Sequence, residues 1–307
     1  MSKTTKNTTE QTSPKASTRW GQDRRLAFID FRLRWDGYIN RSDLTDFFGI
    51  SIPQASLDVA RYTELASQNL SYDRSSRVYQ ATEMFSPIYS ETHPQRYLTD
   101  LLASANGVLE SSLSYIGWQP PIAAVPQPER IVEPGLLAAL LKAIRQELGL
   151  KVVYQSMSRP EPHERIITPH ALAYDGFRWH VRAFCHDHEE FRDFVLGRFL
   201  EVLDVEPVGK SGTEDLEWHT VLTLVLSPHS GLTAGKRRAI ELDYGMREGE
   251  VQLKCRHALL FYTLRQLGLI EGGEQSPESQ QIVLKNKSEI APFLAAKRPS
   301  AREKASK

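Results

Sequence analysis

The chain has 307 residues, with 38 Lys and Arg against 38 Asp and Glu, 40% hydrophobic residues and a mean hydropathy of −0.40. This length accommodates two or three domains, and the composition excludes a fibrous, collagenous or mostly disordered protein. No apolar run approaches the roughly 20 residues that cross a bilayer and the amino end lacks the apolar core of a signal peptide, so we expect a cytoplasmic protein without a membrane partner.

Composition divides the chain into three folded units with polar ends. A Pro-rich stretch starts at Trp118 and a Gly/Ser-rich stretch starts at Val208. Such stretches are typical of linkers, so we predict a multidomain α+β protein. The predicted parts are a disordered tail at 1–18, a first unit at 19–90, a linker helix and Pro-rich linker at 91–133, a second unit at 134–207, a third unit at 214–296 and a basic tail at 297–307.

In the first unit, three helices precede a hairpin. The apolar residues of the first helix lie on or near one face and are Leu26, Ile29, Phe31 and Leu33. A turn at 36–38 leads to a helix over 41–48 that Gly49 can end in the left-handed conformation, and Ser51 can cap a third helix starting at Ile52 or Pro53. The stretch 70–80 alternates around a polar tip at 73–76. Three helices and a hairpin are typical of a winged helix-turn-helix.

The third helix has the side chains of a recognition helix. Ala55, Val59 and Tyr62 or Leu65 face inward, and the outward-facing residues are Gln54, Ser56, Asp58 and Arg61. Arg and Gln read guanine and adenine through paired hydrogen bonds in the major groove, and backbone amides at a helix start hold phosphate. The candidate DNA-binding residues are Ser51, Gln54, Ala55, Ser56 and Arg61, with Arg74 and Arg77 at the hairpin tip.

The charge of this unit leaves a second interpretation open. From Trp20 to Thr82, eight Arg are balanced by eight Asp and Glu, so a winged helix that binds protein stays an alternative to one that binds DNA. However, no Lys occurs between Lys15 and Lys142. A set of cationic residues that are all Arg favours recognition through paired hydrogen bonds over non-directional electrostatic attraction, and therefore favours DNA binding.

The second unit begins with a helix and continues as short strands. Pro134 starts a helix that Gly149 closes, and its apolar stripe is Leu136, Leu137, Leu140, Leu141, Ile144 and Leu148. From Lys151 the hydrophobic period becomes two, over 151–158, 164–174, 176–185 and 191–206. These short strands predict a small antiparallel barrel or a curled sheet.

One face of this sheet is cationic. Alternation places Arg178, His180 and Arg182 on one face and Phe177, Trp179, Val181 and Ala183 on the other. Arg offers forked donors and neutral His adds one donor or acceptor, so the first face suits a phosphate-bearing or otherwise anionic ligand. A solvated face whose charge is balanced by nearby glutamates fits the pattern equally well. Those glutamates are Glu161, Glu164, Glu189 and Glu190.

The third unit alternates between the hydrophobic period of a strand and that of a helix. Strand patterns at 219–227 and 247–255 are each followed by a helix pattern, near 235–242 and over 256–269. This order predicts a small α+β sandwich.

Catalytic and metal-binding patterns are not indicated. Cys185 and Cys255 cannot form a disulfide framework or a four-ligand zinc site by themselves. His186 and His188 flank Asp187 in a predicted hairpin turn, where solvated loop residues are expected instead of ligands. No Gly-x-Ser-x-Gly, His-Glu-x-x-His or closely spaced carboxylate pair supplies a nucleophile or a general acid and base, so we expect no enzyme, metal or cofactor.

The segments YQSMS, TPHALAYDGFRWHVRAF and FRDFVLGRFLEV resemble a WYL domain. Trp179 aligns with the signature Trp, and His180 and Val181 stand where the signature has Tyr and Leu. With a winged helix ahead and a further domain behind, the chain from Trp20 to about Leu294 is similar to the BrxR/CapW-type transcriptional regulators of bacterial phage-defence islands. Segments 43–65 and 227–245 with 256–269 carry the same resemblance.

The resemblance implies a homodimeric repressor of a phage-defence operon that binds double-stranded DNA at an inverted repeat. It further implies a WYL domain, an SH3/Sm-like barrel, that senses a nucleotide or a nucleic-acid fragment, and a WCX-like C-terminal dimerisation domain. Carried over by position, the ligand-binding residues are Ser156, His170, His180, Arg182, Arg192 and Arg198. An activator of the same architecture stays open. So does an effector or scaffold whose winged helix binds protein and whose WYL domain binds single-stranded nucleic acid.

Overall fold

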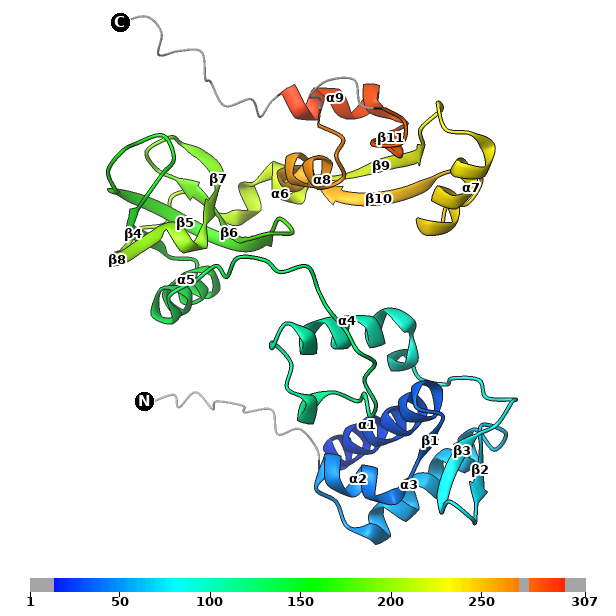
Figure 1. The fold of residues 1–307 in the computed structure, drawn as a ribbon. Helices are drawn as coiled ribbons and strands as arrows, with labels where there is room; N and C mark the ends of the chain where they lie inside the picture. The colour runs from blue at the N-terminus through cyan, green and yellow to red at the C-terminus, as the bar shows by residue number, and fades with distance from the viewer. Residues whose placement is uncertain (1–13, 271–275, 296–307) are drawn as a thin grey trace, which may run out of the picture. The chain divides into compact units, whose positions relative to one another are not determined.

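The computed structural model describes residues 14–270 and 276–295, and the chain divides into two compact units between Gln127 and Pro128 (Figure 1). The second compact unit contains both the second and the third unit predicted from the sequence. Of the predicted tails, 1–13 and 297–307 lie outside the described residues, and 14–18 belong to helix α1 (Pro14–Trp35). Within the described residues, no helix is both long and apolar enough to cross a membrane.

The first unit contains the predicted helices and hairpin. Its sheet has the strand order β1-β3-β2, with both pairings antiparallel. After α1 the elements are β1 (Tyr38–Ile39), α2 (Arg41–Phe48), α3 (Ile52–Leu65), β2 (Leu70–Asp73), β3 (Val78–Ala81), η1 (Ser90–Thr92), α4 (Pro94–Ala105) and η2 (Ser111–Leu113). The predicted winged helix-turn-helix order is therefore present.

Local sequence sets the ends of the two helices that form the turn. At the start of α2, Asn40 accepts from the backbone N–H of Asp43 while Asp43 accepts from that of Asn40. Gly49 ends α2 in the left-handed region with φ of +64°, as predicted. The Ser51 hydroxyl then accepts from the backbone N–H of Gln54 and caps α3.

The core of the first unit forms where α1 packs against α2 and α3. The predicted apolar residues of α1, namely Leu26, Ile29, Phe31 and Leu33, are at most 2% exposed. From α3, Ala55, Val59 and Tyr62 are buried, whereas Leu65 is half exposed, so Tyr62 is the residue that completes the inward face.

One outward-facing assignment on α3 is wrong. Asp58 was predicted to face solvent, but it is fully buried. Arg25 on α1 donates from Nε and Nη2 to its two carboxylate oxygens, at 2.6 and 3.2 Å. A buried carboxylate is stable only when it is paired. The ion pair with Arg25 therefore allows the charged Asp58 side chain to be buried. It also fixes α3 against α1.

The second unit begins with α5 and a five-stranded antiparallel sheet of order β7-β6-β5-β4-β8. The elements are α5 (Pro134–Gln146), β4 (Gly149–Tyr154), β5 (His163–Tyr174), β6 (Trp179–Cys185), β7 (Glu190–Val195), η3 (Leu196–Arg198) and β8 (Phe199–Glu206). Leu136, Leu140 and Ala143 of α5 pack on one sheet face together with Val152 and Val181.

Gly149 does not close α5 as predicted. The helix ends at Gln146, and Glu147 takes the left-handed conformation with φ of +51°. Gly149 instead starts β4, where a Cβ atom would lie 2.4 Å from the carbonyl oxygen of Pro207. The glycine therefore serves the close approach of two strands, a requirement that the sequence pattern does not reveal.

The sheet is not closed, so of the two predicted forms, a small barrel or a curled sheet, the barrel is not formed. In the described sheet β7 and β8 are the edge strands, and no ladder joins them. The short turn η3 nevertheless carries the chain from one edge to the other, which requires strong curvature. At the start of this turn the Tyr154 hydroxyl of β4 accepts from the backbone N–H of Val195, the last residue of β7, at 3.1 Å.

The last part of the chain forms a three-stranded sheet of order β10-β9-β11 with helices packed against it. Its elements are η4 (Gly212–Glu214), α6 (Leu216–His219), β9 (Val221–Pro228), α7 (Ala234–Asp243), β10 (Val251–Arg256), η5 (His257–Leu259), α8 (Leu260–Gln266), β11 (Ile282–Leu284) and α9 (Lys287–Ala295). The predicted order of strand, helix, strand and helix is present. The elements η4, α6, β11 and α9 were not predicted.

Replacing Asp58 with Ala should destabilise the first unit by about 3 to 5 kcal/mol, because it leaves the partly buried Arg25 guanidinium without its partner. Urea unfolding followed by circular dichroism measures this loss. Asp46→Ala, which removes an exposed carboxylate from α2, is the control and should change stability by no more than about 0.5 kcal/mol. Equal effects of the two substitutions would contradict the role given to the ion pair.

Candidate functional site

Helix α3 presents a short polar surface. Arg61 is exposed and donates from Nη1 to Glu64 Oε2 at 2.8 Å, whereas Gln54 and Ser56 are half-buried. Arg41 on α2 donates to the Ser56 hydroxyl at 3.3 Å. Ala55 is fully buried, so its side chain packs the helix against the core and leaves the surface to its neighbours.

The β2–β3 hairpin carries the other two predicted DNA-binding residues at its tip. Arg74 and Arg77 are both exposed, and Arg77 has a left-handed φ of +60°. Asp73 braces the tip because it accepts from the backbone N–H of Ser75 at 2.8 Å and from the Ser76 hydroxyl. The tip therefore holds two guanidinium groups on a fixed turn.

In the second unit, the predicted alternation along β6 is confirmed. His180 and Arg182 lie on one face of the sheet, while Val181 and Ala183 are buried in the core on the other face. However, the cationic face is not open. His180 is 3% exposed and Arg182 only 1% exposed.

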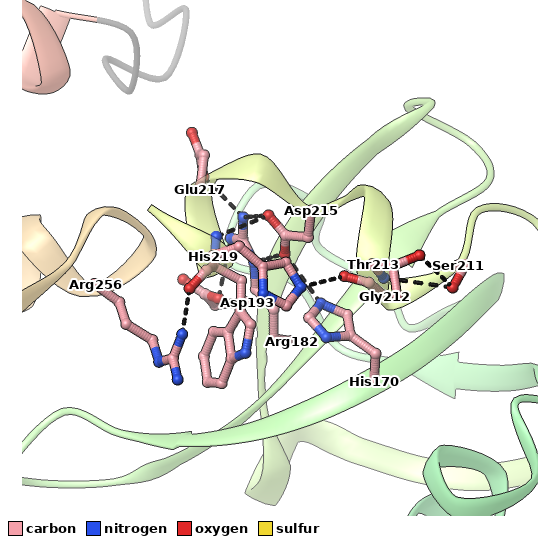
Figure 2. A network of polar contacts seen from close by, with 11 residues as sticks. His170, Arg182, Asp193, Ser211, Gly212, Thr213, Asp215, Glu217, His219 and Arg256 are labelled. Atoms are coloured by element: carbon pink, nitrogen blue, oxygen red, sulfur yellow. Dashed lines mark hydrogen bonds and ion pairs between the residues drawn. The ribbon is translucent and has the colours of Figure 1, made fainter. Parts of the chain in front are cut away.

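Three carboxylates surround the Arg182 guanidinium (Figure 2). Asp215 receives a forked pair, from Nε at 2.7 Å and from Nη2 at 3.1 Å. Glu217 accepts from Nη2 at 2.7 Å, and Asp193 on β7 accepts from Nη1 at 3.2 Å. His170 Nε2 lies 3.0 Å from the same Asp215 carboxylate, so Asp215 joins two of the predicted ligand-binding residues.

The charge states of this network follow from its contacts. Burial raises the pKa of Asp215, but hydrogen bonds from His170 and Arg182 outweigh it and hold the pKa well below the usual range. Burial likewise opposes the charge on Arg182, and its bonds to Asp215 together with the Asp193 charge raise the pKa above its ordinary value. Both groups are therefore ionised at neutral pH.

A second aspartate holds His180. Asp175 Oδ2 lies 3.0 Å from His180 Nε2, and Asp175 Oδ1 accepts from the backbone N–H groups of Phe177 and Arg178 at 2.8 Å each. Burial raises the pKa of Asp175, but the His180 and backbone hydrogen bonds outweigh it and lower the pKa to about 2. The ring of Tyr262 on α8 packs against His180, with ring centroids 5.1 Å apart.

The remaining predicted ligand residues lie elsewhere on the second unit. Ser156 contacts Ser158 in the loop after β4, Arg192 pairs with Glu190 on β7, and Arg198 lies in η3. In the described part of the chain, no hydrogen bond or ion pair joins any of these three to His170 or Arg182.

The carboxylates that balance the cationic face were not predicted. Asp193 lies directly opposite Arg182 in the β6–β7 register, a pairing that the hairpin pattern could have revealed. Asp215 ends the Gly/Ser-rich stretch and Glu217 follows it, both at the start of the predicted third unit, and nothing local marks them. Of the glutamates expected to balance the face, Glu164 pairs with Lys151 and Glu190 with Arg192.

A half-open pocket of about 220 Å³ lies beside this network. It forms between β5, the end of α5 and the segment before β9, and its lining includes Thr168, His170, Ser211, Thr213, Trp218 and His219. The ring of Trp218 meets that of His170 edge-on, with centroids 5.7 Å apart. Imidazole, indole and hydroxyl groups thus line the pocket, and one of them, the His170 imidazole, contacts Asp215.

Cys185, Asp187 and His188 approach one another closely enough to hold a metal ion, with their ligand atoms within 4.8 Å. The Arg165 guanidinium lies among them, with Nη1 3.6 Å from Cys185 Sγ and 3.4 Å from His188 Nδ1. A fixed positive charge at this point opposes a metal cation. His188 and Asp187 are exposed, as the predicted turn implies, whereas Cys185 is buried.

Three family models match successive parts of the chain. Residues 21–103 match the BrxR transcriptional regulator winged helix-turn-helix domain, residues 135–203 the WYL domain, and residues 221–290 the BrxR transcriptional regulator C-terminal dimerization domain. Their order is the one that the sequence resemblance implies.

Curated relatives match almost the whole chain. The DNA-binding transcriptional repressor CapW of Escherichia coli strain KTE188 is 50% identical over 90% of this chain and 93% of its own length. The repressor of that name from Pseudomonas aeruginosa is 48% identical over 96% of this chain and 99% of its own length. Among solved structures, proteasome accessory factor B/C of Arthrobacter aurescens is 17% identical over 90% of this chain and 48% of that chain, with a TM-score of 0.22.

Acid should weaken the second unit through Asp175 and Asp215. Both pKa values are lowered in the folded chain from the ordinary value of 3.8, so their stabilisation is complete above about pH 4. It is lost as pH falls, for Asp175 through about pH 2. Urea unfolding at several pH values measures this slope. Asp215→Asn should reduce the dependence of unfolding free energy on pH. Equal pH dependence in the wild type and in Asp215→Asn would contradict the lowered pKa of Asp215.

Proposed function

Because the chain belongs to the family of CapW DNA-binding transcriptional repressors, we propose that it is a cytoplasmic, homodimeric repressor that binds an inverted repeat in double-stranded DNA. The observation that carries the proposal is the 50% sequence identity to the CapW repressor of Escherichia coli over 90% of the chain. We further propose that the regulated genes form a phage-defence operon. The proposed parts are a DNA-binding domain at 19–90, a linker at 91–133, a WYL domain at 134–207 and a dimerisation domain at 214–296.

In the proposed complex, α3 enters the major groove. Gln54, Ser56 and Arg61 face base edges, and the amides near Ser51 hold a phosphate. Arg61 is paired with Glu64 in the free chain, but an exposed ion pair of this kind contributes no more than about 1 kcal/mol. Replacing the contact between Arg61 and Glu64 with a contact between Arg61 and guanine therefore costs little free energy. Arg74 and Arg77 contact the DNA backbone from the hairpin tip.

A dimer explains why the operator is expected to be an inverted repeat. Two identical winged helices related by a twofold axis meet two identical half-sites in opposite directions. The half-site centres then lie about one helical turn apart, or a multiple of that, on the same side of the duplex. The C-terminal domain supplies the contact between protomers.

The WYL domain is the proposed sensor. A nucleotide or nucleic-acid fragment binds on the face that carries His170, His180 and Arg182, with Ser156, Arg192 and Arg198 as further ligand-binding residues. The ligand shifts the dimer towards an arrangement that holds the operator less tightly. Tenfold release requires a difference of about 1.4 kcal/mol in ligand affinity between the two arrangements.

A gel shift and footprint on the DNA upstream of the chain's own gene tests this function, with a scrambled duplex as competitor and salt varied. Two protected half-sites and a repressed reporter are expected. Equal binding to the scrambled duplex would contradict sequence-specific repression, and an induced reporter would identify an activator.

Arg61→Ala should weaken operator binding by about 1 to 3 kcal/mol because it removes a base-reading guanidinium. Binding to scrambled DNA should change much less, so the ratio of the two affinities should fall. Gel-shift titrations measure both. Arg238→Ala, which removes an exposed Arg from α7, is the control. An unchanged ratio would remove Arg61 from the reading surface.

Arg74→Ala should behave differently, because a phosphate contact is independent of sequence. Affinity for the operator and for scrambled DNA should fall by similar factors, and the slope of log affinity against log salt should decrease by about one. Titration at several salt concentrations measures the slope. A loss confined to the operator would instead make Arg74 a base-reading residue.

A further inference from the structure

The Arg182 site is occupied by the chain's own carboxylates. Asp215 meets the guanidinium in a forked pair, which is the geometry that arginine offers to a carboxylate or phosphate ligand. Glu217 occupies a further position on the same Nη2 atom. An anionic ligand in this place would contact the same nitrogen atoms, so the ligand and the two carboxylates compete.

Two of the three carboxylates belong to a separable piece of chain. Asp193 is part of β7 and cannot leave the sheet without unfolding it. Asp215 and Glu217 lie instead on Ser211–His219, between the last strand of the WYL sheet and the first strand of the C-terminal sheet, which we call the acidic segment. This segment contains only short helical turns, and no strand pairs with it in the described sheets.

Besides Arg182, His170 also contacts the acidic segment, through the Asp215 carboxylate at 3.0 Å and the Trp218 ring. Gly212 packs so closely on His170 that a Cβ there would lie 2.5 Å from the His170 Cβ. Ser211 and Glu214 cap the segment, and their side-chain hydrogen bonds among the described residues stay within it. Thr213, Glu214, Leu216 and His219 are exposed. The segment is therefore attached to the WYL sheet through Arg182 and His170, which both contact Asp215.

Charge and space both require the segment to move before a ligand can bind. One guanidinium against Asp193, Asp215 and Glu217 leaves the site net negative, which repels an anion. The adjoining pocket of about 220 Å³ is also smaller than the usual 300 to 1,000 Å³ of small-molecule sites. Departure of the segment changes both, since it removes two carboxylates and enlarges the pocket on the His170 side.

The same segment contacts the C-terminal domain. Arg256 at the end of β10 donates from Nη1 to the backbone carbonyl of Trp218 at 2.6 Å, and its guanidinium lies 4.7 Å from the Trp218 ring centroid. The backbone N–H of His257 donates to the carbonyl of Thr220 at 2.9 Å. A displacement of the segment would therefore be transmitted directly to β9 and β10.

We propose that the acidic segment is a built-in competitor of the sensor ligand, with the Asp215 and Glu217 carboxylates occupying the anion site of Arg182 until a phosphate-bearing ligand displaces them. Displacement frees Trp218 from Arg256 and shifts the dimerisation domain to the weaker operator-binding arrangement. This inference rests on the proposed function of the WYL domain as a sensor. It adds the internal group that the ligand must replace and the route to the C-terminal domain.

Operator binding without any ligand provides the first test. Glu217→Gln and Asp215→Asn in the full-length chain weaken the hold of the segment and should lower operator affinity about tenfold, a change within the usual range of allosteric coupling. Glu217 is partly exposed, so its substitution preserves the fold, which urea unfolding verifies. Glu201→Gln, an exposed carboxylate on β8, is the matched control. Wild-type affinity in both segment variants would overturn the inference.

Calorimetric titration with a 5′-phosphorylated thymidine dinucleotide provides the second test. Glu217→Gln should bind this probe at least about tenfold more tightly than the wild type, because one competing carboxylate is gone. Arg182→Met in the Glu217→Gln background should abolish that binding. Equal affinity of wild type and Glu217→Gln, or no binding by either, would overturn the competition.

The two tests separate the inference from the proposed function. If the wild-type chain binds no operator, the repressor proposal fails. The dinucleotide titration still tests whether the acidic segment competes with the ligand. If the wild type binds the operator and the segment variants behave like it in both tests, the repressor proposal stands and the built-in competitor is excluded.

Discussion

The ion pair between Arg182 and Asp215 is the interaction on which the arrangement of the second unit depends. Each side chain is 1% exposed, and a buried charge without a partner costs several kcal/mol. Because Asp215 lies beyond the last strand of the WYL sheet, pairing it with Arg182 brings the following chain back onto β6. Tyr262 strengthens this connection, since its hydroxyl donates to Asp193 at 3.1 Å.

The first unit uses buried carboxylates in the same way. Asp58 ties α3 to α1 through Arg25. Asp30, also fully buried, accepts from the Tyr62 hydroxyl of α3 and from the backbone N–H groups of Ile88 and Tyr89 beyond the hairpin. Burial raises the pKa of Asp30 despite these bonds. Directional contacts thus fix the orientation of the recognition helix, which apolar packing alone specifies less sharply.

The range of each interaction explains which features the sequence predicts. The left-handed Gly49 and the Ser51 cap depend on residues within three or four positions, and both were found where the local pattern places them. In contrast, Arg25 with Asp58 and Arg182 with Asp215 are each 33 residues apart. The spacing of apolar residues predicts which face of a helix or strand is buried when the buried residues are apolar. It does not show that a distant arginine will bury an aspartate.

Internal ion pairs also change what the charge count means for DNA binding. From Trp20 to Thr82, eight Arg are balanced by eight Asp and Glu, which suggests a weak electrostatic field. The structure divides those arginines into two groups, because Arg25 and Arg32 pair with Asp58 and Asp36 inside the unit. Internal pairing removes equal numbers of both signs from the surface. The exposed Arg61, Arg74 and Arg77 then act over short distances on a surface that the count alone describes as nearly neutral, which is the local arrangement that base and phosphate contacts require.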